Sequence, residues 1–476
     1  MKKSVVIVGA GLGGLSAAIH CRLKGHDVVV LEQGRVGGKA GRISEGGYTL
    51  DPGPSIIILT EIYKKVFRDA GRNPDDYLQF ERLNPITRVM FRGETIDIPD
   101  GYEAAQGLID RVAPEDSAEF AVMWSKLCKI APLVEKSVFA HPYEKPWQLA
   151  DPSLIKFALP FDVRKTYKEL VDGMFKSPLL RAFFYGFPSY GGQSYRSKAP
   201  GALLIPYFML QDGVWYPKGG VAAIPEAFAR LATELGVEIR TGAKVVGFER
   251  EGNRVSAAIL DDGERIASEV FICNRDRVQT QSWLGRELPA KPSYSYFTVH
   301  MGVRRKFPEL KHHTLFVPDD FEAGFEELYE ERVFPSSPIV YLNNTSDTDS
   351  SVAPEGCSNL FAVVTSPANE DHLDWPALTA ACVDRTLGVM ARAGVAIDAS
   401  EIEMQRVQTP VYFEQEHGNF RGSLYGADEK YRLFGMFPWS NQDSEFRNLL
   451  YVGGSVQPGA GLPMVTLSGK FVAEMV

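Results

Sequence analysis

The sequence has few cysteines, and none is placed to bind a metal ion. The five thiols are an odd number and stand far apart along 476 residues, at Cys21, Cys128, Cys273, Cys357 and Cys382. Structural zinc sites need cysteine or histidine ligands in closely spaced pairs. We therefore expect no metal site. The number and spacing of the thiols suit a reducing cytoplasm, in which they stay unpaired.

Long apolar runs, basic tracts and internal repeats are also missing from the sequence. Without a run of about 18 apolar residues, a membrane-spanning helix is not expected. We expect no signal peptide, because glycines and basic residues interrupt the apolar segment near the start. A net charge of −9, with no basic patch, argues against a nucleic-acid partner. The length suffices for two or three domains.

The first 42 residues carry the strongest local signal. A predicted strand at 5–8 leads through a glycine-rich turn into a predicted helix at 15–23. A second predicted strand, at 28–31, ends on the acidic residue Glu32. This order of strand, glycine turn, helix, strand and acid is typical of a Rossmann-type dinucleotide site.

Each glycine of that turn has a physical role. Gly9 permits the tight turn, Gly11 lets backbone N–H groups approach a pyrophosphate, and Gly14 lets the helix pack closely on the strand. The positive end of the helix would face the phosphates. Glu32 can accept hydrogen bonds from the hydroxyls of a ribose. The turn therefore predicts binding of an adenine dinucleotide.

A second glycine-rich, basic turn at 35–42 favours FAD over NAD as that dinucleotide. Such a turn suits extended wrapping around a large cofactor that stays bound. Together with the opening turn and the segment at 48–55, it resembles the superfamily of flavin-containing amine oxidases and carotenoid desaturases. Near the C-terminus, residues 448–463 again show a strand and a glycine-rich turn, with a helix predicted from Met464. In that superfamily this feature lies at the ribityl and isoalloxazine end of FAD.

Further blocks narrow the resemblance to the bacterial-type phytoene desaturase (carotenoid desaturase) family. In order along the chain they are YGGQS at 190–194, YPKGG at 216–220, TDSSVAPEGC at 348–357, GSLYG at 422–426 and GGSVQPGAGLP at 453–463. They extend over essentially the whole chain. One departure is Gln457, which stands where the commonest family form has a histidine, so no catalytic role can be placed on an imidazole there.

The turns and the resemblance together predict a set of FAD-binding residues. These are Gly9, Gly11, Leu12, Gly13, Gly14, Glu32, Gln33, Gly38, Lys39, Gly41, Arg42, Pro54, Ser55, Val245, Gly454, Ser455, Gly461, Leu462 and Pro463. The fold class implied is α/β, with a Rossmann-type FAD-binding domain, a mixed-sheet substrate domain and a helical lid that contacts a membrane. The expected division assigns 1–65, 205–290 and 415–476 to FAD, 66–110 and 291–414 to the substrate domain, and 111–204 to the lid.

The resemblance implies a polyene substrate, which offers no charged group for the protein to bind. Recognition would come from an apolar tunnel. The apolar and aromatic residues of 142–216 suit either the lining of that tunnel or a contact with a membrane surface. Seven further aromatic residues also suit the tunnel, namely Phe297, Phe316, Phe361, Phe413, Phe434, Phe437 and Trp439.

Desaturation would remove a hydride to the flavin and a proton to a base or to water. The catalytic base stays unassigned, with Asp151 as a weak candidate that equally suits the cap of a helix. His300, His372 and His417 are isolated in sequence and are interpreted as structural.

Several functions stay open at this point. The first is a membrane-associated FAD-dependent carotenoid desaturase, located at the cytoplasmic membrane surface. Alternatives are a carotenoid isomerase, saturase or ketolase of the same family, a flavin amine oxidase for a small polar amine, and a flavin-bound lipid carrier without catalysis. Quinone or oxygen is expected as electron acceptor, because no second dinucleotide turn is found for a nicotinamide.

Overall fold

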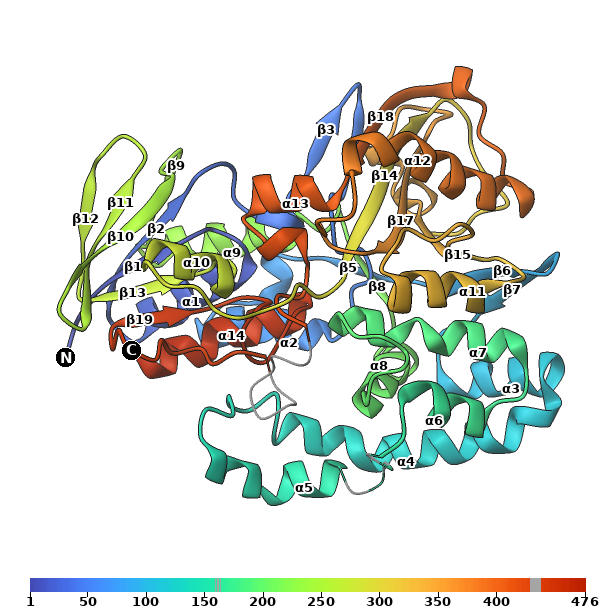
Figure 1. The fold of residues 1–476 in the computed structure, drawn as a ribbon, viewed down its shortest axis with the longest axis horizontal. Coiled ribbons are helices and arrows are strands. Elements are labelled where there is room, and N and C mark those ends of the chain that lie inside the picture. Colours follow the sequence, from blue (N-terminus) through green and yellow to red (C-terminus); the bar gives the residue numbers. More distant parts are fainter. Residues whose placement is uncertain (159, 161, 163, 429–437) are drawn as a thin grey trace.

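The computed structural model describes residues 1–158, 160, 162, 164–428 and 438–476. Three parts are visible in Figure 1: a sheet flanked by helices on the left, a larger sheet at the upper right, and a lobe of helices below. Both chain ends lie in the left-hand part. Segments from the beginning, the middle and the end of the chain therefore meet there.

The left-hand part is built on a five-stranded parallel sheet of order β19-β13-β1-β2-β9. Its strands are β1 (Ser4–Val8), β2 (Asp27–Glu32), β9 (Glu238–Thr241), β13 (Val270–Cys273) and β19 (Leu449–Tyr451). Residues Val5–Val8 of β1 are buried throughout. This continuous burial is typical of a parallel sheet covered on both faces. A small antiparallel sheet adjoins it, formed by β10 (Val245–Glu251), β11 (Arg254–Leu260) and β12 (Arg265–Ala267).

Four helices cover this sheet and its neighbourhood: α1 (Leu12–Leu23), α2 (Thr60–Asp69), α9 (Ala223–Glu234) and α14 (Leu462–Met475). Small residues let α1 and α14 approach closely. A Cβ atom at Gly469 would lie 2.5 Å from the Cβ of Ser16, inside van der Waals contact. The C-terminal helix is thus packed directly on the helix that follows the first glycine turn.

The second sheet has seven strands in the order β18-β14-β17-β16-β15-β6-β7. All neighbours are antiparallel except β15 and β6, so the sheet is mixed, as predicted. Its strands are β6 (Thr87–Phe91), β7 (Glu94–Ile98), β14 (Ser295–Val303), β15 (His313–Val317), β16 (Val340–Asn343), β17 (Ser358–Ser366) and β18 (Ile402–Gln408). Helix α12 (Trp375–Arg392) packs against it through a core that contains Trp375, Cys382 and Met390.

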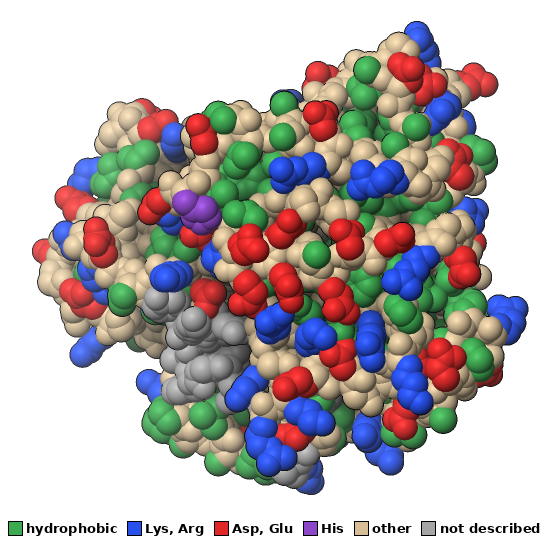
Figure 2. Space-filling model, turned by 45° about the vertical axis from the view of Figure 1, so that its right-hand side comes forward, with side chains coloured by type: hydrophobic (Ala, Val, Ile, Leu, Met, Phe, Trp, Pro, Cys, Tyr) green, Lys and Arg blue, Asp and Glu red, His purple; other side chains and the backbone are tan. Residues whose placement is uncertain are grey.

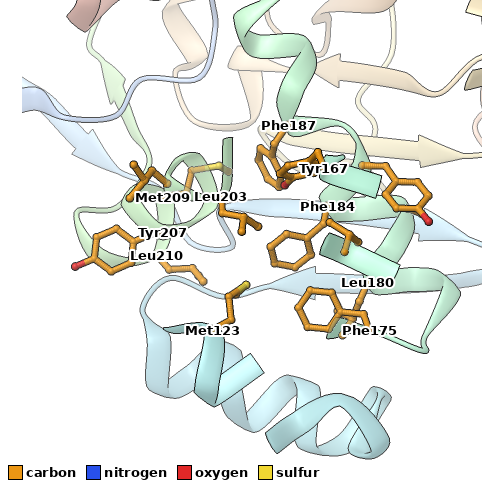
Figure 3. Close-up of a cluster of buried hydrophobic side chains, with 14 of the residues drawn as sticks. Met123, Tyr167, Phe175, Leu180, Phe184, Phe187, Leu203, Tyr207, Met209 and Leu210 are labelled. Atoms are coloured by element: carbon orange, nitrogen blue, oxygen red, sulfur yellow. The ribbon is translucent and has the colours of Figure 1, made fainter. Parts of the chain in front are cut away.

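The helical lobe lies below the second sheet (Figure 1) and holds an extensive apolar cluster. Its helices are α3 (Tyr102–Val112), α4 (Ser117–Glu135), α5 (Pro152–Ala158), α6 (Tyr167–Met174), α7 (Pro178–Tyr185) and α8 (Leu204–Gln211). Figure 3 shows side chains from these helices converging, with Met123, Phe184 and Leu210 among them. Among the described residues, no helix is long and apolar enough to cross a membrane.

One local prediction needs correction. The helix predicted from residue 15 begins earlier, at Leu12, because glycines of the turn form its first turn. Strands β6 and β7 form a hairpin, whereas the preceding strand β5 (Phe80–Arg82) pairs with β8 (Trp215–Pro217). Pro85 separates β5 from β6, and a proline has no N–H to continue a ladder. The division of the chain into three domains stays a prediction.

Candidate functional site

A cavity of about 1540 Å³ connects the glycine-rich turns with the helical lobe. Pockets for one small ligand usually measure about 300–1,000 Å³. The larger volume fits two ligands that meet inside the protein. Its lining falls into a polar glycine-rich part and an apolar part, which are described in turn.

Glu32, at the end of β2, borders the polar part of the cavity. Both carboxylate oxygens of the buried Glu32 accept backbone hydrogen bonds, from Ala10 N at 2.7 Å and from Gly34 N at 2.8 Å. A carboxylate has about four acceptor sites, so each oxygen keeps capacity for a ribose hydroxyl. Glu32 therefore holds the turn together while still facing the cavity that it lines.

The glycine turn is shaped around the side chain of Asn274. A Cβ atom at Gly11 would lie 2.8 Å from one terminal atom of the Asn274 amide, and one at Gly453 would lie 2.8 Å from the other. Asn274 directly follows β13, at the carboxyl edge of the parallel sheet, where open α/β folds bind ligands. Asn274 was not predicted from the sequence, because it is identified only once β13 lies beside β1.

Two helix N-termini border the cavity without a side-chain cap. Neither Gly11, before α1, nor Gly461, before α14, caps its helix through a side chain. The first N–H groups of each helix thus stay available for an anion. Such a cradle, closed by glycines and opposite Glu32, fits the pyrophosphate and ribose of FAD.

The cavity brings together all of the predicted FAD-binding residues except Gly14. A Cβ atom at Gly14 would lie 2.1 Å from the carbonyl oxygen of Gly9. The close packing of the helix on the turn therefore requires a glycine at this position. Lys39 donates to Asn419 Oδ1 at 3.1 Å, and burial lowers the pKa of its ammonium group, while Asp276 opposes this shift. Direct contact of each lining residue with FAD stays a prediction.

The other part of the cavity is walled mainly by apolar side chains from the helical lobe and the second sheet. They include Val134, Val138, Phe139, Ala182, Phe183, Phe187, Leu204, Ile205, Phe208, Met209, Leu315, Phe321, Phe325 and Leu328. Of the segment 142–216, the lining residues all lie between Ala182 and Met209. Of the other aromatic residues predicted there, Phe361 and Phe413 line it, whereas Phe297, Phe316 and Trp439 are not among the lining residues and pack in the protein core. Phe434 and Phe437 lie outside the described residues.

Hydroxyl groups interrupt this apolar wall at one place. Tyr296 and Tyr425 share a hydrogen bond between their hydroxyl oxygens, which are 2.7 Å apart. The hydroxyl of Tyr341 lies 2.8 Å from Ser55 Oγ and 2.7 Å from His313 Nδ1. Burial lowers the pKa of His313 well below its ordinary value, so its imidazole is neutral. Apart from Ser55 and Tyr425, which lies in the block at 422–426, these side chains were not predicted from the sequence.

Asp151, the weak candidate for a catalytic base, does not line the cavity. Its carboxylate accepts from Ser153 N at 2.7 Å, at the start of α5, and from the hydroxyl of Tyr143 at 2.9 Å. These contacts are those of a helix cap, and they place Asp151 in a structural role. Of the three isolated histidines, His417 lines the cavity, with its pKa lowered to about 4 mainly by burial.

Comparison with known proteins decides the family. The family model of flavin-containing amine oxidoreductases matches residues 12–474. The chain belongs to the flavin-containing amine oxidoreductase family. The predicted FAD cofactor and the predicted class of enzyme, an oxidoreductase, are thereby confirmed.

Within this family the chain is similar to two bacterial carotenoid enzymes. It is 32% identical over 496 residues to 4,4'-diaponeurosporene oxygenase of Staphylococcus aureus, covering 100% of this chain and 98% of the relative. It is 32% identical over 491 residues to 4,4'-diapolycopene oxygenase of a Methylomonas species, covering 99% and 97%. These relatives confirm the resemblance to a carotenoid-modifying branch of the flavin-containing amine oxidoreductases.

Solved structures confirm the predicted α/β fold. An oxidoreductase from Methanosarcina mazei matches with a TM-score of 0.65 and 16% identity, covering 99% of this chain and 100% of that one. Putrescine oxidase bound to putrescine matches with a TM-score of 0.62 and 15% identity, covering 100% and 98%. At these identities the likeness shows the fold of the flavin-containing amine oxidoreductases.

Proposed function

We propose that this protein is an FAD-dependent enzyme that oxidises a long polyene of the carotenoid class. The observation that carries the proposal is the continuity of one cavity, which joins the dinucleotide cradle at Gly11 and Glu32 to a wall of apolar side chains. The two relatives that act on carotenoids, according to their names, support the choice of substrate.

Binding of a hydrocarbon in this cavity depends on area and shape. Burial of apolar surface contributes about 25 cal/mol per Å². A long polyene therefore needs no ion pair to bind. When bound, the flavin supplies the redox step. The chain's own residues hold the polyene, as Phe183 and Phe208 are placed to do, and exclude water from it.

Two reactions are compatible with this site. The sequence blocks favour desaturation, in which the polyene loses two hydrogen atoms. The names of the relatives favour oxygenation, in which it gains oxygen. Mass analysis of the product separates them, because the first lowers the mass of the polyene and the second raises it. An isomerase would leave the mass unchanged.

The test is anaerobic mixing of the purified FAD-bound protein with a carotenoid hydrocarbon while the flavin absorption is followed. Bleaching of the flavin, followed by recovery with oxygen or a quinone, is the expected result, and it also identifies the electron acceptor. Putrescine serves as the comparison substrate. Bleaching by the amine and by no polyene would overturn the proposal, and polyene binding without bleaching would indicate a carrier.

We infer that the polyene is taken from a membrane surface, and a short exposed segment of the helical lobe supports this contact. Trp147 is 71% exposed and Ile155 in α5 is 44% exposed, with Lys145 and Lys156 exposed beside them. Figure 2 shows hydrophobic side chains among basic ones along the lower edge of the molecule. Exposed apolar groups flanked by lysines favour binding to anionic lipids.

Sedimentation with anionic vesicles tests this contact. The double variant Trp147→Ser and Ile155→Ser is expected to lose vesicle binding. Leu23→Ser, which removes an exposed apolar side chain at the end of α1, is the matched control and is expected to bind like the wild type. Equal binding of all three proteins would contradict the placement of the contact.

A further inference from the structure

Two sequence blocks without a role in the dinucleotide site meet in the apolar part of the cavity. Tyr190 and Gly192 belong to the block at 190–194, and Tyr425 belongs to the block at 422–426. A Cβ atom at Gly192 would lie 2.5 Å from the Cβ of Tyr425, so the position needs a glycine to leave room for the tyrosine side chain. Tyr425 then forms the 2.7 Å hydrogen bond with Tyr296 of β14. All three tyrosines line the cavity.

The hydroxyl of Tyr190 has no hydrogen-bond partner within the part of the chain that the structure describes. The residue is 36% exposed, yet burial raises the pKa of its phenol well above the ordinary value, and the phenols of Tyr296 and Tyr341 raise it further. A phenol that is surrounded by protein and still has exposed surface faces an interior space. Its exposed area therefore opens onto the cavity, close to Tyr296 and Tyr341.

The protons of these phenols can be counted. In the pair of Tyr296 and Tyr425, one hydroxyl donates to the other. Ser189 also hydrogen-bonds Tyr296, and because Ser189 donates its own proton to Gly186 O at 2.7 Å, it can accept the remaining proton of the pair. The proton of Tyr190 stays free. The cluster, which we define as Tyr190, Tyr296 and Tyr425, thus offers the Tyr190 hydroxyl as a hydrogen-bond donor to a ligand, and a carbonyl oxygen can accept such a bond.

A pure hydrocarbon has no acceptor and forms no hydrogen bond with these hydroxyls. Burying a hydroxyl without a partner costs free energy, and phenylalanine would line the same space without that cost. The free donor of Tyr190 therefore indicates a ligand that carries a hydrogen-bond acceptor. A carboxylate is disfavoured, because the neighbouring groups, Ser55 and the neutral His313, bring no positive charge.

We propose that the cluster of Tyr190, Tyr296 and Tyr425 binds a carbonyl oxygen carried by the polyene. The site would hold an aldehyde or ketone end group as product or as substrate of a further turnover. This inference rests on the proposed function, since it assumes that a polyene occupies the cavity. It adds a specificity site that selects oxygenated polyenes over hydrocarbons of equal length.

The experiment compares two ligands of equal chain length, a carotenoid hydrocarbon and its terminal aldehyde. Both are added in detergent to the anaerobic FAD-bound protein, and their dissociation constants are measured by absorption. The aldehyde is expected to bind more tightly, and its C=O stretching frequency in the Raman spectrum is expected to fall when the carbonyl accepts hydrogen bonds. The double variant Tyr190→Phe and Tyr296→Phe is expected to weaken aldehyde binding about tenfold and hydrocarbon binding very little.

Tyr63→Phe is the matched control, because the Tyr63 hydroxyl is buried without a partner but is not among the residues that line the cavity. It is expected to leave both dissociation constants unchanged. If the wild type binds the aldehyde no more tightly than the hydrocarbon, with an unshifted C=O frequency, the oxygen site is wrong while the proposed function stands. If neither polyene binds, the proposed function itself fails. The frequency measurement on the wild type keeps the test decisive should the double variant not fold.

Discussion

The side chain of Gln457 hydrogen-bonds both backbone groups of Tyr143, a residue far away in sequence. Tyr143 N donates to Gln457 Oε1 at 2.6 Å, and Gln457 Nε2 donates to Tyr143 O at 2.9 Å. Both residues are only 1% exposed. Gln457 lies in the C-terminal glycine-rich turn, and Tyr143 lies between α4 and α5. The pair therefore ties the turn at the cofactor cradle to the helical lobe.

Replacing Gln457 with alanine is expected to destabilise the protein and loosen this connection. The variant removes the two hydrogen bonds from Gln457 to the buried backbone of Tyr143, and the loss of a buried hydrogen-bond partner costs about 1–3 kcal/mol. We expect a lower free energy of unfolding in urea, and weaker retention of FAD during dialysis.

Gln405→Ala is the control for this variant. Gln405 is exposed on β18 and carries no such pair, so its replacement is expected to change the free energy of unfolding by less than about 0.5 kcal/mol. Equal stability of the two variants would show that the pair between Gln457 and Tyr143 contributes nothing.

Gly14→Ala is expected to disrupt the first turn. The added Cβ would lie 2.1 Å from the carbonyl oxygen of Gly9, and backbone atoms cannot move aside as a flexible side chain can. We expect a loss of about 1–3 kcal/mol or more in unfolding free energy, together with a colourless purified protein. Gly107→Ala in α3 meets no atom within 4 Å and is expected to retain FAD and gain up to about 1 kcal/mol. A yellow, stable Gly14→Ala protein would contradict the packing described here.

Asp51 is expected to make stability depend on pH. Its buried carboxyl group accepts from Val221 N at 2.8 Å, and burial raises its pKa from 3.8 to about 7. The folded state thus binds this proton more tightly than the unfolded chain. The free energy of unfolding therefore falls as pH rises from 3.8 to about 7, by at most about 1.4 kcal/mol per pH unit.

Urea unfolding across that pH range, with the wild type and Asp51→Asn, measures this contribution. The amide keeps an oxygen for Val221 N and does not titrate, so the variant is expected to lose this part of the pH slope. Asp261→Asn, on an exposed turn after β11, is the control and is expected to keep the wild-type slope. Identical slopes for all three proteins would refute the assignment to Asp51.

Asp151→Asn is expected to leave turnover of the polyene unchanged. The carboxylate caps α5 and contacts Tyr143, outside the cavity lining. The asparagine oxygen can still accept from Ser153 N. Steady-state rates of flavin reduction measure the effect. A large fall in rate, with normal unfolding behaviour, would restore Asp151 as a catalytic residue.

The dinucleotide cradle was predictable because its chemistry is local. A strand, a turn of glycines and an acid such as Glu32 follow one another within a short segment, so their spacing alone indicates the site. The C-terminal turn at 453–463 was found from its own glycine pattern and was assigned to the flavin through the resemblance. Asn274, in contrast, is identified only when β13 lies beside β1, and no local pattern marks it.

The amino-acid sequence by itself determined the class of fold and the flavin cofactor, because glycines at sharp turns mark the dinucleotide site and the sequence blocks carry the family resemblance. The apolar ligand was what that resemblance implied. Only the tertiary structure decided which side chains face the ligand. Phe361 lines the cavity and Phe297 packs in the core, although both stand in strands of one sheet. The phenols of Tyr190, Tyr296 and Tyr425 come from segments far apart and meet only after folding. The reason is physical: whether a side chain faces core or cavity depends on how distant elements pack, and local sequence does not encode that geometry.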